Sequence, residues 1–339
     1  MLPARYRKLV ATGHSRDFRA VAEVVEVPLQ HPGPGEVLIQ NRHAGVNASD
    51  VNITSGLYLG HAAPPFDLGV EAVGEVVAVG EGVTHLAVGD AALTLYRGGG
   101  YREYQCVSAK QAFAAPAASR QVLGLGLSGL TASIGLEEIG GLRPVAEGAQ
   151  RSTVLVTAAA GATGSFAVQL ARRAGHHVIG TCGGPDKAAL LAKLGCDRII
   201  DHRAQSVDEA LKAHYPDGVD LVYEGVGGAL FDTCVAHLAT RGTLLVVGYI
   251  SEYDTGAQPI TRPRIYEQLL WKSAQIRAFL VSHYPRCIPA HLANLLEALE
   301  AGQLQVPLEA RDFQGVNSVC DAVEALHSGQ TRGKVVVSF

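Results

Sequence analysis

The stretch 152–181 constrains the fold most, because it joins a buried strand, a glycine-rich turn and a helix in one unit. An apolar, β-branched run at 153–157 predicts a strand that is covered on both faces. A helix is expected near 165–174, and a second strand at 178–182 completes a βαβ unit. This is the setting in which a glycine-rich turn binds a dinucleotide.

The turn between that strand and helix consists of small residues. Its N–H groups and the start of the helix would face a pyrophosphate, and its glycines would allow close approach. Ala159 stands in the first glycine position of the usual G-x-G-x-x-G pattern, so an ordinary tight turn is the alternative interpretation. The residues expected to contact the dinucleotide are Ala160, Gly161, Ala162, Thr163 and Gly164.

Strand and helix patterns alternate through the rest of this region, which predicts an α/β fold with a doubly wound parallel sheet. Strands are expected at 153–158, 178–182, 198–200, 219–223, 243–248 and 275–281, and helices near 165–174, 185–195, 206–214, 228–239 and 265–273. Residues 5–110 instead alternate short apolar runs with Gly/Pro turn clusters, which favours a compact β-barrel-like domain. A helical pattern at 122–139 follows it, and the tail after residue 282 is expected to return to this first domain.

The composition excludes several classes of partner. The 339 residues carry a formal net charge of −4, and Lys and Arg form no long block, so nucleic acid and anionic membrane surfaces are not expected partners. The N-terminus lacks the apolar run of a signal peptide, and no run of 18 apolar residues predicts a membrane span. The six cysteines are widely spaced with no C-x-x-C pair, which is typical of reduced thiols in a cytoplasmic protein.

The end of the second strand indicates which dinucleotide is bound. NAD-preferring sites usually place Asp or Glu about 20 residues beyond the glycine turn, but here the stretch is Thr181-Cys182-Gly183-Gly184. Lys187 follows at the start of the next helix, where its ammonium would attract a 2′-phosphate. NADPH is therefore the expected cofactor, and a merely solvated Lys187 is the alternative.

Several stretches together resemble the zinc-independent, quinone oxidoreductase-like branch of the medium-chain dehydrogenase/reductase superfamily. They occur in family order over essentially the whole chain: 45–50 (GVNASD), 64–71 (PPFDLGVE), 129–132 (GLTA), 158–164 (AAAGATG) and 333–336 (GKVV). The resemblance implies a GroES-like catalytic domain at 1–126 and 285–339 and a Rossmann NADPH-binding domain at 127–284. It also implies a homodimer and NADPH-dependent reduction of activated double bonds.

Further cofactor positions follow from the resemblance alone. His202 stands where the family often has a Tyr that contacts the 2′-phosphate. The adjacent Arg203 would supply the positive charge instead; the alternative is that Arg203 is an ordinary solvent-exposed residue. For the apolar positions, core packing is the competing explanation. The remaining positions implied by the resemblance are Thr131, Gly225, Val226, Gly248, Tyr249, Phe279, Leu280 and Val281.

The positions of the family's metal ligands predict a metal-free site. Zinc-using relatives have a Cys where Asn47 stands and a His where Val70 stands, and neither residue here is a good zinc ligand. His43, His61 and His85 are candidate substitutes, but a lone loop histidine is usually just solvated. Hydride transfer without a Lewis acid favours conjugated acceptors, because an enone or quinone delocalises the developing charge.

The resemblance places Tyr58 and Asn47 at the reacting centre. A phenol can protonate an enolate or position a water that does so, while a half-buried loop aromatic is the alternative for Tyr58. Asn47 would orient substrate or ribose, with a structural turn role as the alternative. The pocket is expected to be lined by loops near 58–67, 96–101 and 249–266, with the glycines of 97–101 forming a flexible gate.

Three functions compete at this stage. The first is an NADPH-dependent reductase of α,β-unsaturated carbonyls such as 2-alkenals, enones and 15-oxoprostaglandin-like substrates. The second is a quinone reductase, and the third is an NADPH-binding protein with a structural or regulatory role. Side-chain chemistry read from the sequence does not choose among them.

Overall fold

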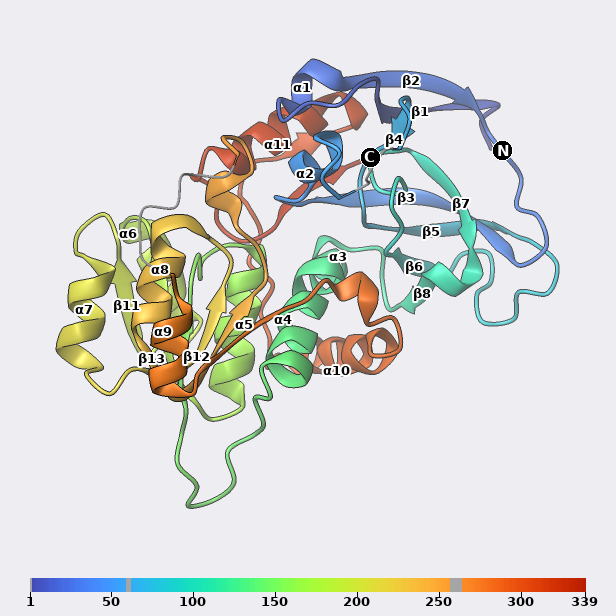
Figure 1. The fold of residues 1–339 in the computed structure, drawn as a ribbon. Helices are drawn as coiled ribbons and strands as arrows, with labels where there is room; N and C mark the ends of the chain where they lie inside the picture. The colour runs from blue at the N-terminus through green and yellow to red at the C-terminus, as the bar shows by residue number, and fades with distance from the viewer. Residues whose placement is uncertain (1, 59–61, 257–263) are drawn as a thin grey trace. The chain divides into compact units, whose positions relative to one another are not determined.

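The computed structural model describes residues 2–58, 62–256 and 264–339 of the chain. It divides into two compact units, which are described separately (Figure 1). Unit 1 comprises Met1–Leu127 and Leu308–Phe339, and unit 2 comprises Ser128–Pro307.

Unit 2 is built on a six-stranded sheet in which every pairing is parallel. The strand order is β11-β10-β9-β12-β13-β14, so the chain leaves β9 in one direction and returns to its other side at β12. A doubly wound sheet binds ligands at this switch point, outside the carboxyl ends of the strands. The strands are β9 (Thr153–Val156), β10 (His177–Cys182), β11 (Arg198–Asp201), β12 (Val219–Glu224), β13 (Leu238–Val246) and β14 (Gln275–Ala278).

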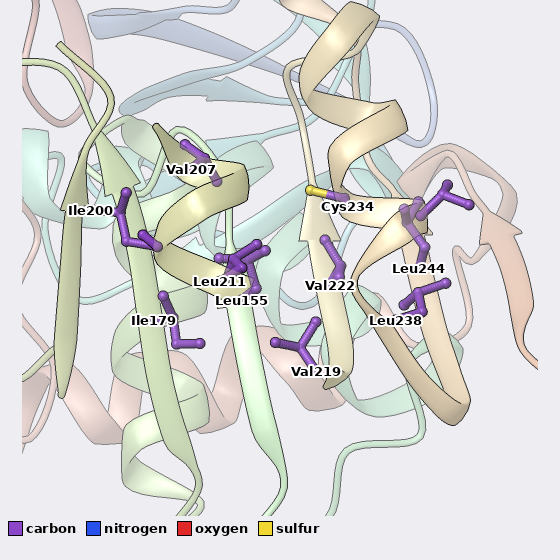
Figure 2. Close-up of a cluster of buried hydrophobic side chains, with 12 residues drawn as sticks. Leu155, Ile179, Ile200, Val207, Leu211, Val219, Val222, Cys234, Leu238 and Leu244 are labelled. Atoms are coloured by element: carbon purple, nitrogen blue, oxygen red, sulfur yellow. The ribbon is translucent and has the colours of Figure 1, made fainter. Parts of the chain in front are cut away.

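Each of these strands matches an expected one, and the crossover helices match as well. They are α5 (Ala162–Arg173), α6 (Pro185–Lys193), α7 (Val207–His214), α8 (Gly228–Ala236) and α9 (Tyr266–Lys272). Figure 2 shows how α7 and α8 cover one face of the sheet, with Leu211 and Cys234 packed against strand residues such as Leu155 and Val222. All four of these side chains are fully buried, which is why β9 and the middle of β12 (221–223) are apolar.

Unit 1 is rich in β-structure, as its short alternating runs predicted. One sheet runs β15-β16-β3-β5-β6-β8 with β7 also paired to β3, and a second runs β2-β1-β4. The strands are β1 (Arg5–Ala11), β2 (Ala22–Pro28), β3 (Glu36–Val46), β4 (Phe66–Asp67), β5 (Ala72–Val79), β6 (Ala91–Thr94), β7 (Tyr104–Ser108), β8 (Ala112–Ala115), β15 (Phe313–Gln314) and β16 (Val335–Ser338). Four α-helices accompany them in the described residues, α1 (Phe18–Val21), α2 (Asp50–Thr54), α3 (Arg120–Gly124) and α11 (Val319–His327).

The C-terminal tail returns to unit 1, but later than the expected boundary at 285. Helix α10 (Ile288–Glu300) belongs to unit 2, because it packs against α4 (Leu130–Ile134) and its buried His291 is hydrogen-bonded to Ser133. The chain then enters unit 1 at Leu308, and β16 pairs antiparallel with β3. The tail is therefore joined to unit 1 by the pairing of β16 with β3, and helix α10 is not part of that unit.

The expected helical run at 122–139 is divided into four pieces. They are α3 (Arg120–Gly124), η2 (Leu125–Gly129), α4 and η3 (Gly135–Ile139), and the backbone leaves helical geometry at Gly126 (φ −55°, ψ −116°). By length and mean hydropathy this run could cross a membrane, and it is the one such helix among the described residues. Its most apolar 18-residue window is 78 % buried inside the protein.

Candidate functional site

The turn from β9 to α5 is shaped for close backbone approach. Ala158 adopts a left-handed backbone (φ 46°), and Gly161 is the N-cap of α5. A Cβ on Gly164 would lie 2.5 Å from the Ala158 carbonyl oxygen, so only glycine fits at that position. The structure thereby places Ala160, Gly161, Ala162, Thr163 and Gly164 at the start of a 12-residue helix, where N–H groups and the helix dipole favour an anion.

A buried carboxylate joins this turn to the end of β12. Glu224 accepts hydrogen bonds from the backbone N–H of Val226 (2.8 Å) and Gly227 (3.1 Å) and from the Thr157 hydroxyl (3.2 Å). Gly225 in turn donates its N–H to Thr157 Oγ1 at 2.9 Å. Burial raises the pKa of Glu224, and the backbone donors oppose that rise.

This interaction fixes the 225–228 turn at the switch point, next to the glycine turn. Sequence analysis placed Gly225 and Val226 near the cofactor but missed the role of Glu224. The available signal was an acid at the end of a buried strand, directly before the glycine-rich stretch Gly225-Val226-Gly227-Gly228.

Cationic side chains gather around the turn between β10 and α6. A Cβ on Gly183 would lie 2.9 Å from His202 Nε2 and 3.1 Å from Arg203 Nε, so this glycine lets both side chains approach the backbone. Lys187, in the first turns of α6, is half-buried, whereas His202 and Arg203 are exposed. His202 and Arg203 thus lie together at Gly183, while Lys187 lies on the helix that follows, and the assignment of all three to a 2′-phosphate stays a prediction.

Sequence analysis missed Asp201, which ends the neighbouring strand β11. Its Oδ1 accepts hydrogen bonds from the backbone N–H of Gly184 (2.9 Å) and Arg203 (3.0 Å), and these bonds hold the pKa of the carboxyl below its usual value. The carboxylate therefore organises the backbone that carries Gly184 and Arg203. Only strand pairing between β10 and β11 shows this, since Cys182 and Asp201 are partners in register.

The remaining expected cofactor positions lie on other elements of unit 2. Tyr249 packs edge-on against Tyr253 (ring centroids 4.7 Å apart), and a Cβ on Gly227 would lie 2.8 Å from Tyr249 Cβ, so the turns after β12 and β13 touch. Gly248 belongs to the same turn, and Thr131 lies half-buried on α4. Phe279, Leu280 and Val281 lie beyond the end of β14 rather than within it, because the strand ends at Ala278.

The Phe279 ring packs on unit 2, where a Cβ on Gly135 would lie 3.0 Å from it, and it meets Tyr284 edge-on. Leu280 is 44 % exposed. Core packing therefore accounts for Phe279. It does not account for Leu280, because nearly half of that side chain is exposed.

On unit 1, Tyr58 lies just after α2 and is half-buried. Its backbone N–H donates to the Asn52 carbonyl (3.2 Å), and its own carbonyl accepts a hydrogen bond from Arg97 Nη1 (3.3 Å). The main chain at Tyr58 is thus held from both sides. Among the described residues, no hydrogen bond is made by the phenol oxygen, so the structure leaves the predicted proton-donor role open.

Asn47 is part of a buried charge network in unit 1. Its Nδ2 donates to Glu71 Oε1 (3.0 Å) and to the Gly45 carbonyl (3.2 Å), and its Oδ1 accepts from Lys334 Nζ (2.7 Å). Lys334 and Glu71 form an ion pair at 2.5 Å with both side chains fully buried, and Glu71 Oε2 also accepts the Leu127 N–H at 2.7 Å. The structure therefore shows the alternative, structural role for Asn47, and its catalytic role stays a prediction.

The glycines of 97–101 do not form a flexible gate, so that expectation was wrong. Gly98, Gly99 and Gly100 are buried, and a Cβ on Gly69 would lie 2.4 Å from the Tyr101 nitrogen. These glycines are needed for close packing of two backbone segments rather than for mobility. The fully buried Tyr101 donates its phenol to Asp50 Oδ2 at 2.5 Å, and burial raises the pKa of Asp50 to about 6.

The histidines considered as metal ligands have other partners. His43 Nδ1 lies 3.0 Å from Ser338 Oγ, and burial beside Arg120 and Arg42 lowers its pKa to about 4. His85 Nε2 lies 3.0 Å from the Ala109 carbonyl. His61, with 59–61 and 257–263 of the expected pocket loops, lies outside the described residues.

Within the described part of the chain, one group of three potential ligand side chains lies together, remote in sequence from Asn47 and Val70. It consists of Glu137, Glu138 and His291 in unit 2. A metal-free reacting centre remains a prediction from the sequence.

Comparisons with known proteins agree with both units. Residues 33–117 match the family model described as alcohol dehydrogenase GroES-like domain, and residues 162–298 match the one described as zinc-binding dehydrogenase. With these matches and the full-length relative described next, the chain belongs to the medium-chain dehydrogenase/reductase family, in its quinone oxidoreductase-like branch.

Two curated relatives and one solved structure illustrate the place of the chain in this family. It is 43 % identical to prostaglandin reductase-3 of Mus musculus, over 100 % of this chain and 90 % of that protein. It is 39 % identical to a probable quinone oxidoreductase of Leishmania amazonensis, over 99 % of both chains. The Escherichia coli quinone oxidoreductase complexed with NADPH superposes with a TM-score of 0.86 and 26 % identity, covering 98 % of this chain and 100 % of that one.

Proposed function

We propose that this protein is an NADPH-dependent oxidoreductase that reduces the activated C=C bond of α,β-unsaturated carbonyls. The observation that carries the cofactor choice is the position of His202 and Arg203 against Gly183, with Lys187 near the start of the helix that follows. A 2′-phosphate needs cationic donors at this position, where an NAD site would carry an acid for the ribose hydroxyls. The named activities of the relatives, a prostaglandin reductase and quinone oxidoreductases, support the substrate class.

The residues of unit 2 fit a dinucleotide in three respects. The start of α5 offers N–H groups, Gly164 admits no side chain, and Glu224 fixes the turn after β12. When bound, NADPH supplies a hydride. Unit 2 therefore binds and orients the hydride donor. The turns at the switch point carry small residues, which leave room for the dinucleotide.

Unit 1 supplies the proton in this proposal. Hydride addition to the β-carbon breaks the C=C π bond, and its electron pair moves through the α-carbon onto the carbonyl oxygen as an enolate. Tyr58, or a water that it positions, then donates a proton to the α-carbon. The contacts of Asn47 with Glu71 and Lys334 hold its side chain in place, whether it orients the substrate or only supports the turn.

A parallel assay tests the function. NADPH oxidation is followed with a 2-alkenal, a 15-oxoprostaglandin and a quinone, and again with NADH in place of NADPH. We expect turnover of the two carbonyl substrates with NADPH and much weaker turnover with NADH. Quinone turnover alone would favour the second candidate, a quinone reductase, which the relatives' names also support. Tight NADPH binding with no turnover would favour the structural or regulatory role.

The proton donor is tested separately by Tyr58→Phe in single-turnover NADPH oxidation. A donor role predicts a slower step with unchanged NADPH binding, while an unchanged rate would remove Tyr58 from catalysis. A modest effect would identify solvent as the proton source.

We also propose a cytoplasmic homodimer. In the described residues β14 pairs only with β13, which leaves one edge of the sheet open. Tyr266, Leu270 and Trp271 on α9 are 66 %, 76 % and 79 % exposed, and an exposed apolar set beside a free strand edge favours a partner. Light scattering of the purified protein tests the dimer, and fractionation of the source cells tests the location.

A further inference from the structure

The loop 96–101 of unit 1 is a rigid support. Gly98 N–H donates to the Gly69 carbonyl at 2.6 Å, Tyr101 N–H donates to the Leu68 carbonyl at 3.2 Å, and the Leu9 N–H donates to the Tyr101 carbonyl at 2.8 Å. Side chains carried by this loop therefore start from a fixed backbone. Arg97 is the one charged residue in the loop.

The Arg97 guanidinium contacts the main chain of Tyr58, the residue proposed to donate the proton. Its Nη1 donates to the Tyr58 carbonyl at 3.3 Å, and the side chain is exposed to solvent. Among the described residues, no carboxylate lies within ion-pair distance of Arg97 and it makes no other hydrogen bond. A guanidinium has five N–H donors arranged for bidentate binding of a carboxylate, so most of this capacity is available to a ligand.

The surface beside Arg97 is apolar. Leu57, which precedes Tyr58, is 53 % exposed, and Tyr96, which precedes Arg97, is 36 % exposed. Large apolar side chains next to a cation suit a ligand with an acyl chain that ends in a carboxylate. A short 2-alkenal or a neutral quinone would leave the cation without a counter-charge.

We propose that Arg97 selects carboxylate-bearing, acyl-chain substrates at the Tyr58 site. The inference rests on the proposed function, since it assumes that the acceptor binds beside Tyr58. It divides the candidate substrates by charge: an enone that carries a distal carboxylate is bound at Arg97, and its neutral counterpart lacks this contact. Arg97 is thus a specificity residue that does not touch the reacting atoms.

The test compares a 15-oxoprostaglandin with its methyl ester, which lacks the negative charge and carries one additional methyl group. For the wild-type protein we expect kcat/KM to be about five- to tenfold higher for the acid, the effect of one partly exposed charge-assisted bond. Arg97→Gln should bring the acid-to-ester ratio close to one, and Arg97→Lys should keep part of it. Added salt should lower the wild-type ratio, because it screens an exposed pair.

Lys110→Gln is the matched control, because it removes the same charge from an exposed position on the same unit. It should leave the acid-to-ester ratio at the wild-type value. A wild-type ratio near one, or a ratio that Arg97→Gln does not change, would overturn the inference while leaving the reductase function standing.

Binding is measured in the same set by calorimetry with NADPH-loaded protein and each ligand. If neither ligand turns over but the acid binds more tightly in an Arg97-dependent way, anion selection stands and the reductase function fails. Equal affinity of acid and ester would overturn the selection directly.

Discussion

Two regions of the molecule differ in how far their charged and polar side chains are exposed to solvent. Around Gly183 in unit 2, Lys187, His202 and Arg203 lie at the start of a helix and remain partly or fully exposed. In unit 1, Glu71 and Lys334 are fully buried and satisfy each other and Asn47. The charges of the unit 1 pair thus meet inside the protein, whereas the unit 2 residues lie where we propose that the 2′-phosphate of NADPH binds.

The largest effect is expected from breaking the unit 1 pair. Lys334→Met leaves the fully buried Glu71 carboxylate without its cation, and removal of one partner of such a pair costs about 3–5 kcal/mol. Urea unfolding measures the loss. Arg42→Met is the control, because its ion pair with Glu75 (3.0 Å) is largely exposed and should contribute less than about 1 kcal/mol.

The double variant Glu71→Gln with Lys334→Met should recover part of the lost stability, because no uncompensated charge remains. Equal losses in Lys334→Met and Arg42→Met would show that the unit 1 network is not the tight internal pair described here.

On the unit 2 side, Gly164→Ala should be the most damaging small change. The added methyl would lie 2.5 Å from the Ala158 carbonyl oxygen, and such overpacking costs about 1–3 kcal/mol and displaces the turn. NADPH affinity by fluorescence titration and unfolding in urea measure the two consequences. Gly13→Ala serves as control, since its Cβ would meet Val21 at an ordinary 3.5 Å.

Protonation of Asp50 tests a second buried charge in unit 1, one without a cation as its hydrogen-bond partner in the described residues. Burial raises the pKa of Asp50 from 3.8 to about 6, so the folded protein binds more protons than the unfolded chain between these values, and stability falls as pH rises through them. Asp50→Asn removes this loss. Relative to wild type, the variant should gain about 3 kcal/mol between pH 3.5 and pH 7.5, read from urea unfolding at both pH values. A pH-independent difference would contradict the raised pKa.

The smallest change tests the proposed contact between Lys187 and the 2′-phosphate of NADPH. Lys187→Ala should raise the KM for NADPH about tenfold with little change for NADH, the effect of one charge-assisted contact to phosphate. Lys193→Ala, at the exposed end of the same helix, should change neither value. Equal effects on NADPH and NADH would remove Lys187 from the 2′-phosphate site.

The same contrast explains how much was predictable from the sequence. The sheet of unit 2 followed from continuous apolar runs and glycine turns, because local pattern and burial agree there. The family resemblance also pointed to Lys187 for the 2′-phosphate, and that role stays a prediction. The roles of Glu224 and Asp201 depend on which strands are neighbours, and strand order is not written in local pattern.

In unit 1 the sequence misled at the 98–100 loop and did not reveal the partners of Asn47. The glycine run at 98–100 has the composition of a flexible loop. In the structure it packs closely against Gly69, which is distant in sequence. Asn47 has the position of a site residue, but Lys334 and Glu71 meet it from distant parts of the chain. Contacts between residues far apart in the sequence cannot be predicted from the local sequence pattern around either residue.

Transfer of label from the cofactor tests the central claim most directly. NADPH carrying deuterium at C4, in the position that is transferred, is oxidised by the wild-type protein with a 2-alkenal or a 15-oxoprostaglandin, and the product is analysed by NMR. The account predicts one deuterium at the former β-carbon, a saturated C–C bond and an intact carbonyl. Deuterium at the carbonyl carbon, or no label in any product, would contradict it.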